Sequence, residues 1–541
     1  MANSKNYKFQ KNLNLIKLHL ASNNIDKALS YLLIGEKLEP NNYAILNEIG
    51  ACFAKKGLHD KALEYHIKAS SLAPNNHIIV ANTGLDLIKL ERFHEGIEFL
   101  EKSVALTQKN SIAYIGLISA YHSLGNHQKV SEISLKGIAE FPEMAEFHGS
   151  LGVALIGLNK LEEAEYCIKT ACILNPSLTE SRLNLARIHS IRKEHYEAIK
   201  LYEEILYNES FPREEIITVC KYNLSYEYFQ IGDLEKGWDY YDFGFDSNVS
   251  ASQRRKPNRN FSVPRWNGDN IESKTLLVWA EQGLGDEIMF LSMLNDISCD
   301  VKNIIIECDK RLVDIVKRSF PSVIARPAII DINGKSKFND FDFEIPIGSL
   351  GKYCRRNISD FKSSTYLLPS KNISNELEKF FERNNKYIKI GICWRSGLLN
   401  IERENSYIPL SNWGEIFKIP NAIFINLQYG NCEAELIKAE ELFGVHIYRW
   451  DFIDLKNDLE SVFSIINKLD VIVTAATAVS PMAYSIGKPT LTFMPTLDWT
   501  SFGTNYFPFS KNMIPFTSAK IDNFYSVLSK IANYIKEKFP K

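Results

Sequence analysis

The sequence of 541 residues predicts an α-solenoid followed by an α/β region with two doubly wound lobes. A regular period of 34 residues in the first half indicates the solenoid. After residue 273, short runs rich in β-branched residues alternate with amphipathic stretches, which is typical of parallel βαβ units. Between these parts lies a polar stretch with two prolines, residues 252–273, which we interpret as a linker.

The repeat units start at six evenly spaced positions, which are Phe9, Tyr43, His77, Ser111, Ala145 and Thr179. Each unit has the pattern of two short amphipathic helices, and such a pair buries its apolar face only by stacking on its neighbours. A seventh unit starts near Thr218. The sequence therefore predicts a superhelix of about seven repeats over residues 9–251, with a concave inner surface.

Three features recur within the units. A small residue stands at the twentieth position of every unit except the one with Val130: Ala28, Ala62, Gly96, Ala164 and Ala198. Proline, which ends a helix because it lacks an N–H, recurs near the end of four units: Pro40, Pro74, Pro142 and Pro176. Gly57 and Gly125 occupy the same position, in the turn between the two helices of their units.

These residues resemble the tetratricopeptide repeat family. The resemblance implies a protein partner on the concave face. We expect an acceptor protein there, and the alternative is a scaffold without a role in chemistry.

The composition argues against several classes of protein. With 63 basic and 65 acidic side chains, the chain has no global field that attracts nucleic acid, so we expect no nucleic-acid partner. No apolar run reaches the length of about 18 residues that spans a bilayer, and the first residues lack the apolar core of a signal peptide. We therefore expect a cytoplasmic protein. The nine cysteines include no CxxC pair, which argues against a zinc site or a disulfide scaffold.

The α/β region contains seven predicted strands: TLLVWA, NIIIEC, IKIGICW, AIFINLQ, VHIYRW, DVIVTA and TLTFMP. They suffice for an N-terminal lobe over residues 274–368 and a C-terminal lobe over residues 385–541, divided by a polar loop and helix. Ligands of parallel sheets bind beyond the carboxyl ends of the strands. The residues that directly follow each strand are therefore the candidates for a site.

The first candidate segment is TLLVWAEQGLGDEIMF, in which a strand leads through a turn into a helix. Gly283 and Gly285 permit a tight turn and the close approach of a ligand. Asp286 stands at the expected helix start, where a plain N-cap is the alternative interpretation. The α/β half contains one histidine, His446, inside the apparent strand VHIYRW. A carboxylate is therefore the natural general base, and Asp286 and Glu281 are the best-placed candidates.

The second and third candidate segments offer groups for a phosphate. Trp394, Arg395 and Ser396 follow a predicted strand, and Arg403 lies in the loop beyond. Arginine donates two parallel hydrogen bonds to phosphate, although a surface arginine is the alternative interpretation. The third segment holds Thr477, Ala478, Val479 and Ser480, between a strand and a short helix with Pro481 in its first turn. Helix N-termini bind phosphate, although capping by Ser480 alone is the alternative interpretation.

Together these segments resemble the heptosyltransferase-like branch of the GT-B glycosyltransferases and, more closely, the bacterial tetratricopeptide-repeat glycosyltransferases, which include flagellin-modifying enzymes. The other matching stretches are RSFP at 318–321, IPIGSL at 345–350, NLQYG at 426–430, and DWT at 498–500. The resemblance implies two facing Rossmann-like lobes of GT-B type with a nucleotide sugar in the cleft between them. It implies that Asp286 is the catalytic base or its orienting partner, and that no metal or other cofactor is needed. It further implies donor binding by Arg395, by Gln428 in the NLQYG stretch and by the Thr477–Ser480 turn.

The sequence departs from the heptosyltransferase pattern at two positions of the last turn. Ala476 stands where that branch carries aspartate, and Pro481 stands where it carries histidine. This argues against an ADP-heptose donor, and analogy favours a CMP-activated nonulosonic acid. The function we predict is the transfer of a sugar from a nucleotide sugar to a serine or threonine hydroxyl of a protein, with flagellin as the candidate acceptor. The alternative is a non-catalytic repeat scaffold whose degenerate transferase-like domain binds a nucleotide or a partner.

Overall fold

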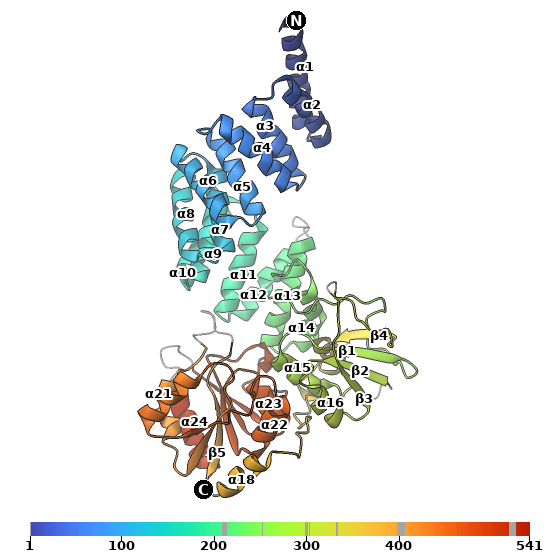
Figure 1. Cartoon of the computed structure of the whole chain (residues 1–541), viewed down its shortest axis with the longest axis vertical. Helices are drawn as coiled ribbons and strands as arrows, with labels where there is room; N and C mark the ends of the chain where they lie inside the picture. Colours follow the sequence, from blue (N-terminus) through green and yellow to red (C-terminus); the bar gives the residue numbers. More distant parts are fainter. Residues whose placement is uncertain are drawn as a thin grey trace. The chain divides into compact units, whose positions relative to one another are not determined.

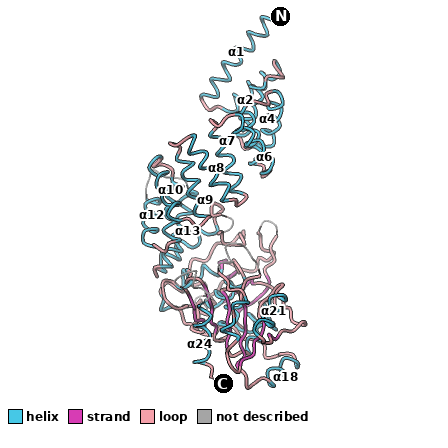
Figure 2. The backbone as a smooth tube through the Cα atoms, turned by 90° about the vertical axis from the view of Figure 1, so that its left-hand side faces the viewer, coloured by secondary structure: helices cyan, strands magenta, loops and turns pink. Residues whose placement is uncertain are grey.

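The computed structural model describes residues 2–207, 214–250, 253–297, 301, 303–331, 334–397, 406–518 and 526–540. The chain divides into two compact units, Met1–Pro212 and Arg213–Lys541, which we describe separately. The range of 9–251 that the sequence predicts for the solenoid runs across the boundary between these units. Among the described residues, all strands belong to the second unit (Figures 1 and 2).

The first unit is a stack of helical pairs in which consecutive helices pack against one another (Figure 2). Its helices are α1 (Ala2–Ala21), α2 (Ile25–Leu38), α3 (Tyr43–Lys55), α4 (His59–Leu72), α5 (His77–Lys89), α6 (Phe93–Leu106), α7 (Ser111–Ser123), α8 (His127–Glu140), α9 (Ala145–Gly157), α10 (Leu161–Leu174), α11 (Thr179–Ile191) and α12 (His195–Tyr207). The predicted proline stops are confirmed, because α2, α4, α8 and α10 each end two residues before a proline. This is a long helical repeat array of the tetratricopeptide type.

The small residue at the twentieth position of each repeat lies where two helices come closest. Ala28, Ala62, Ala164 and Ala198 have no exposed surface. A Cβ atom on Gly96 would stand 2.5 Å from Cδ1 of Ile88 and 3.0 Å from the carbonyl oxygen of Gly84. The packing of the array therefore depends on small volume at this position.

The turn within each pair has one backbone conformation in all six repeats of the first unit. Gly57 and Gly125 adopt positive φ angles of 74° and 67°. The residues at the same repeat position elsewhere are also left-handed, although none is glycine: Asn23, Glu91, Asn159 and Lys193. The helix geometry thus imposes the left-handed turn, and two of the six repeats meet it with the residue that adopts it without strain.

The second unit begins with one more helical pair, α13 (Glu214–Gln230) and α14 (Leu234–Tyr241), and then forms two parallel sheets. The first sheet has the order β3-β2-β1-β4, and the second has the order β10-β9-β8-β5-β6-β7. The strands are β1 (Thr275–Trp279), β2 (Asn303–Cys308), β3 (Val323–Pro327), β4 (Phe343–Pro346), β5 (Ile388–Cys393), β6 (Ala422–Asn426), β7 (Ile447–Tyr448), β8 (Val471–Ala475), β9 (Thr490–Met494) and β10 (Met513–Thr517). All pairings are parallel, so each sheet has one edge where the carboxyl ends of its strands meet.

Helices separate the strands along the chain. They are α15 (Leu284–Phe290), α16 (Val313–Ser319), α17 (Gly351–Cys354), α18 (Asn375–Arg383), α20 (Gly414–Phe417), α21 (Glu433–Phe443), α22 (Leu459–Lys468), α23 (Val479–Ser485) and α24 (Ser526–Lys538). Helix α15 follows β1 of the first sheet and packs against α23, which lies between β8 and β9 of the second sheet (Figure 1). This contact brings the two sheets together. Within the described residues, no helix is long and apolar enough to cross a membrane.

Helices α13 and α14 are part of the core of the second unit. Phe229 and Trp238, which are fully buried, pack against Phe502 with ring centroids 5.3 and 5.9 Å apart. The ring of Tyr241 packs against the ring of Trp499, with their centroids 5.6 Å apart. Phe502 and Trp499 follow β9 of the second sheet, so the last helical pair is bound to the α/β fold by aromatic packing.

The sequence placed His446 inside a strand, and this was wrong. The strand β7 covers Ile447–Tyr448, and His446 precedes it on the surface, where its Nδ1 lies 2.9 Å from Oε1 of Glu440.

Candidate functional site

The carboxyl edges of the two sheets border a cavity of about 640 Å³, a size typical of small-ligand sites. Its lining comes from loops of both lobes: Gly283, Gly285, Asp286, Met289, Ser396, Ser406, Tyr407, Tyr429, Ala476, Thr477, Ala478, Ser480, Pro481, Tyr484, Thr492, Met494, Pro495, Thr496, Asp498, Thr500, Phe507 and Met513. Seven of the residues singled out in the sequence are among them: Gly283, Gly285, Asp286, Ser396, Thr477, Ala478 and Ser480.

The turn between β1 and α15 brings its glycines to the second lobe. The amide of Gly283 donates a hydrogen bond of 3.2 Å to Oδ2 of Asp286. A Cβ atom on Gly285 would stand 3.5 Å from Cα of Ala478 and 3.5 Å from Cγ of Pro481. The turns that carry Asp286 and Ala478 therefore lie in direct contact, although almost 200 residues separate them in the sequence.

Asp286 is a carboxylate that holds a proton unusually well. Burial raises its pKa, and the negative charges of Glu281 and Asp498 raise it further, whereas the Gly283 amide lowers it. The outcome is a pKa of about 6. Such a group is ionised near neutral pH and is a stronger base than an exposed aspartate.

Asp498 is a second carboxylate on the cavity wall, and the sequence analysis did not select it as a site residue. Its Oδ1 accepts a hydrogen bond of 3.0 Å from the amide of Thr500 and a second bond from the Thr500 hydroxyl. Asp498 follows strand β9, so the rule that sites lie beyond strand ends would have found it.

The turn after β8 presents hydroxyl groups to the cavity. The hydroxyl of Thr477 accepts a hydrogen bond of 3.3 Å from the amide of Val479. The hydroxyls of Ser480 and Thr492 share a hydrogen bond of 2.9 Å. Val479 itself is buried in the core and does not line the cavity.

The segment after β5 sends one of its three candidate residues to the cavity, Ser396. Trp394 is buried, and its Nε1 donates to Oε2 of Glu435 at 2.5 Å. The guanidinium of Arg395 also donates to Glu435, with Nε 3.0 Å from Oε1, and its Nη2 donates to the carbonyl oxygen of Asn431 at 2.9 Å. Helix α21, which carries Glu435, thus holds Arg395 away from the cavity.

Gln428 and Glu281 do not line this cavity, although Gln428 lines the smaller cavity described below. Oε1 of Gln428, which is buried, accepts hydrogen bonds from the amides of Trp394 and Arg395 at 3.1 and 3.0 Å. Glu281 is also buried, where Nε of Arg255 donates to its Oε2 at 2.6 Å. Arg403 lies outside the described residues.

A second cavity of about 300 Å³ lies at the carboxyl ends of β6 and β7. Asn431, Arg449 and Trp450 line it, and Tyr429 lines both cavities. The two cavities are therefore neighbours along the edge of the second sheet. In the part of the chain that the structure describes, no three histidine, cysteine or acidic side chains gather as a metal site would require.

Comparison with known proteins identifies the repeats. Residues 13–76 match the tetratricopeptide repeat family. The chain is 25% identical over 436 residues to Protein FlbA of Caulobacter vibrioides, in an alignment that covers 78% of this chain and 72% of FlbA. Among solved structures, it is similar to MamA from Desulfovibrio magneticus RS-1, with 24% identity over 32% of this chain and 97% of that chain, at a TM-score of 0.30. It is also similar to PilW, a type IV pilus biogenesis factor, with 18% identity over 38% and 96% of the two chains, at a TM-score of 0.35. The repeat match indicates a module for protein interaction.

Proposed function

We propose that the chain is a glycosyltransferase of GT-B type, in which two Rossmann-like lobes bind a nucleotide sugar and the tetratricopeptide repeats bind the acceptor protein. The observation that carries the proposal is the 640 Å³ cavity, which Asp286 of the first lobe shares with Ser396 and Thr477 of the second. A site between two lobes, beyond the carboxyl ends of parallel strands, is where such sheets bind nucleotides.

Asp286 is the proposed general base. A serine or threonine hydroxyl of the acceptor attacks the anomeric carbon of the donor and gives its proton to the Asp286 carboxylate. The new bond joins the acceptor oxygen to the anomeric carbon, while the bond from that carbon to the phosphate oxygen breaks and its electron pair leaves with the nucleotide. The pKa of about 6 supports this role, because the base is ionised at neutral pH yet binds a proton readily.

The donor is proposed to lie along the second lobe. Hydroxyl groups donate to phosphate oxygens, and Ser396 and Thr477 supply them on the cavity wall. Because Glu435 binds the guanidinium of Arg395, that arginine is not part of the proposed phosphate site. Arg403 stays a candidate cation from the sequence. The smaller cavity beside Tyr429 offers the half-buried ring of Trp450 and the amide of Asn431 to a nucleotide base.

The acceptor is proposed to be a protein, because the repeats are interaction modules. The narrower proposal, which rests on the sequence resemblance, is flagellin as the acceptor and a CMP-activated nonulosonic acid as the donor in a cytoplasmic reaction that needs no metal.

The test is donor binding followed by turnover. The chain is heated with CMP-, UDP-, GDP- and ADP-sugars in turn, and we expect one class to raise the melting temperature, because a ligand at about 100 times its Kd adds about 2.7 kcal/mol of stability. Release of the free nucleotide and the mass of a co-expressed bacterial flagellin then report hydrolysis and transfer. Asp286→Asn should keep the thermal shift and lower the turnover rate by about 10²- to 10⁴-fold. Asp342→Asn is the matched control, because Asp342 lies in the same lobe, outside both cavities.

Two outcomes would contradict the proposal. If no nucleotide sugar changes the melting temperature, the cavity is not a donor site. If a nucleotide sugar binds and is neither hydrolysed nor transferred, the non-catalytic scaffold is the better description.

A further inference from the structure

A buried ion pair, Arg255–Glu281, lies at the start of the turn that carries Asp286. Arg255 has no exposed surface, and its Nε donates to Oε2 of Glu281 at 2.6 Å, while its Nη2 donates to Oε1. Oε1 of Glu281 also accepts the amide of Gly348 at 2.9 Å. These charge-assisted hydrogen bonds restrict the orientation of the Glu281 carboxylate, which lies two residues beyond the end of β1.

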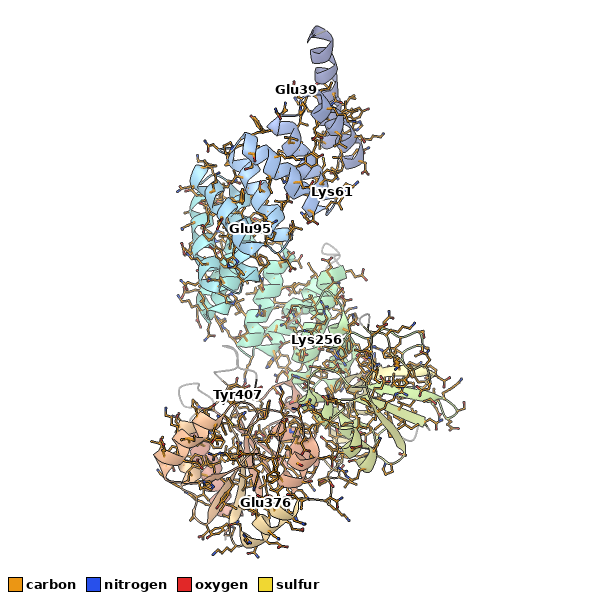
Figure 3. The ribbon with its side chains drawn as sticks, viewed as in Figure 1. Glu39, Lys61, Glu95, Lys256, Glu376 and Tyr407 are labelled. Atoms are coloured by element: carbon orange, nitrogen blue, oxygen red, sulfur yellow. The ribbon has the colours of Figure 1, made fainter. Side chains whose placement is uncertain are left out.

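The next residue of the turn, Gln282, is held by the last helical pair. Its φ angle is +60°, in the left-handed region that costs a non-glycine residue energy and that persists only when the surroundings enforce it. Two contacts supply that enforcement. The amide of Gln282 donates to the carbonyl oxygen of Lys256, a loop residue labelled in Figure 3. The side-chain Nε2 of Gln282 donates to the hydroxyl of Tyr241 at 2.7 Å.

One of these contacts ends on α14 itself, and the other ends beside Arg255, which contacts Tyr241. Tyr241 is the last residue of that helix and has no exposed surface. The guanidinium of Arg255 lies over the ring of Tyr241, 3.9 Å from its centroid, and its Nη1 donates to Oδ1 of Asp242 at 2.9 Å. Helix α14 packs against α13 and α17 in the second unit. One cluster therefore joins the repeat-type helix α14 to the residues just before Asp286.

We propose that Tyr241 and Arg255 are positioning residues: through Gln282 and Glu281 they hold the Gly283–Asp286 turn against the second lobe, and helix α14 is thereby part of the active site. The catalytic consequence rests on the proposed function. None of these four side chains lines either cavity, so each acts through the turn and not on a substrate.

The first test uses a fold-preserving substitution and its matched control. Tyr241→Phe removes the hydroxyl that accepts the hydrogen bond from the side-chain Nε2 of Gln282, and it keeps the buried ring. Tyr353→Phe removes a tyrosine hydroxyl elsewhere in the same unit, where it donates to the carbonyl oxygen of Trp266 at 3.3 Å. In hydrogen–deuterium exchange of peptides that cover residues 281–290, we expect Tyr241→Phe to speed exchange about five-fold, as the loss of one hydrogen bond implies. Tyr353→Phe should leave the exchange of these peptides within about two-fold of wild type.

The second test compares two buried carboxylates. Glu281→Gln keeps the shape of the side chain and removes its charge. Glu307→Gln does the same on the neighbouring strand β2, where Nη2 of Arg259 donates to Oε2 of Glu307 at 2.6 Å and Nε of Arg326 donates to Oε1 at 3.0 Å. If a nucleotide sugar turns over, Glu281→Gln should lower kcat about 10- to 100-fold and leave KM for the donor within about three-fold, because misplacement of the base affects the transition state. It should also move the acid limb of the rate profile to lower pH, since the charge of Glu281 raises the pKa of Asp286. Glu307→Gln should do neither.

The results separate this inference from the proposed function. If wild type turns over no nucleotide sugar, the proposed function fails, and the exchange comparison alone decides whether α14 holds the turn. Equal exchange in Tyr241→Phe and Tyr353→Phe would overturn the inference. Faster exchange in Tyr241→Phe with an unchanged kcat in an active enzyme would overturn its catalytic part.

Discussion

Asp286 and Asp498 line the same cavity from the two lobes, and the charge of Asp498 is one of the causes that raise the pKa of Asp286. They are the acidic side chains among the described residues of that wall. A second negative charge in the same space disfavours the ionisation of Asp286, which brings the pKa of the proposed base toward neutral pH.

Asp498→Asn should therefore lower the pKa of Asp286 below about 6, because it removes one of the negative charges that raise this pKa. Burial and the charge of Glu281 remain in the variant. Asparagine still accepts the Thr500 amide, so the loop keeps its shape. We expect the acid limb of the rate profile to move to lower pH, with the rate at pH 5 relative to pH 8 rising about two- to five-fold. Nucleotide release between pH 4.5 and 9 measures this. An unchanged midpoint would show that Asp498 does not influence the base.

Glu287 gives a prediction about stability that is independent of activity. This buried carboxylate accepts the amide of Asp309 at 2.9 Å, and burial raises its pKa to about 8. The folded state thus holds a proton that the unfolded state releases at its ordinary pKa of 4.5, so this group lowers stability as pH rises from about 4.5 to about 8. Glu287→Gln removes the ionisation and should stabilise the second unit on the order of 2 kcal/mol at pH 8. Melting curves at several pH values test this, and the stability of the variant relative to wild type should decline as the pH falls from 8 toward 4.5.

The left-handed turns of the repeats predict a stabilising substitution. Glu91 is exposed at the turn between α5 and α6 with a φ of 60°. Glu91→Gly should raise the unfolding free energy of the array by up to about 1 kcal/mol, because glycine adopts this conformation without strain. Helical circular dichroism during melting is the measurement. Gly57→Ala, the reverse change at the equivalent position, should lower the melting temperature, and the same sign for both variants would refute the argument.

A buried hydrogen-bond cluster joins α4 to α5 in the N-terminal part of the array. Asp86 lies 2.5 Å from Nδ1 of His66 and 3.0 Å from Nδ1 of His59. Asp86→Ala leaves two ring nitrogens without this acceptor and should cost about 2–4 kcal/mol, seen as faster hydrogen exchange in α3 to α5. Asp26→Ala, which removes an exposed partner of Lys56, should cost less than about 1 kcal/mol. Equal effects of the two changes would argue against the cluster as a source of stability.

The period of the sequence predicted where five helices of the first unit begin, which are α3, α5, α7, α9 and α11, because the spacing of the repeats is regular. The first helix, α1, differs, because it begins at Ala2, before the predicted start at Phe9. The strands β1, β2, β5, β6, β8 and β9 also follow the predicted runs. Strands β3, β4 and β10 were not predicted: VIARP, FEIP and MIPFT are short and contain proline, and only their neighbours in the sheet make them strands.

The site was harder to predict than the fold. Backbone position follows from strand ends, so Asp286 and Thr477 could be selected. The direction of a side chain depends on partners from elsewhere in the chain. Glu435 turns Arg395 away and Arg255 buries Glu281, and neither pairing has a signature in the local sequence.

Because α13 and α14 belong to the second unit, they determine where a stable fragment of the α/β region can begin. A fragment that starts at the linker near residue 252 would lack Trp238 and Tyr241. The aromatic rings of Phe502 and Trp499, which pack against them, would then be exposed to solvent. An autonomous α/β piece must therefore begin upstream of residue 214, inside what the amino-acid pattern presents as one unbroken series of repeats.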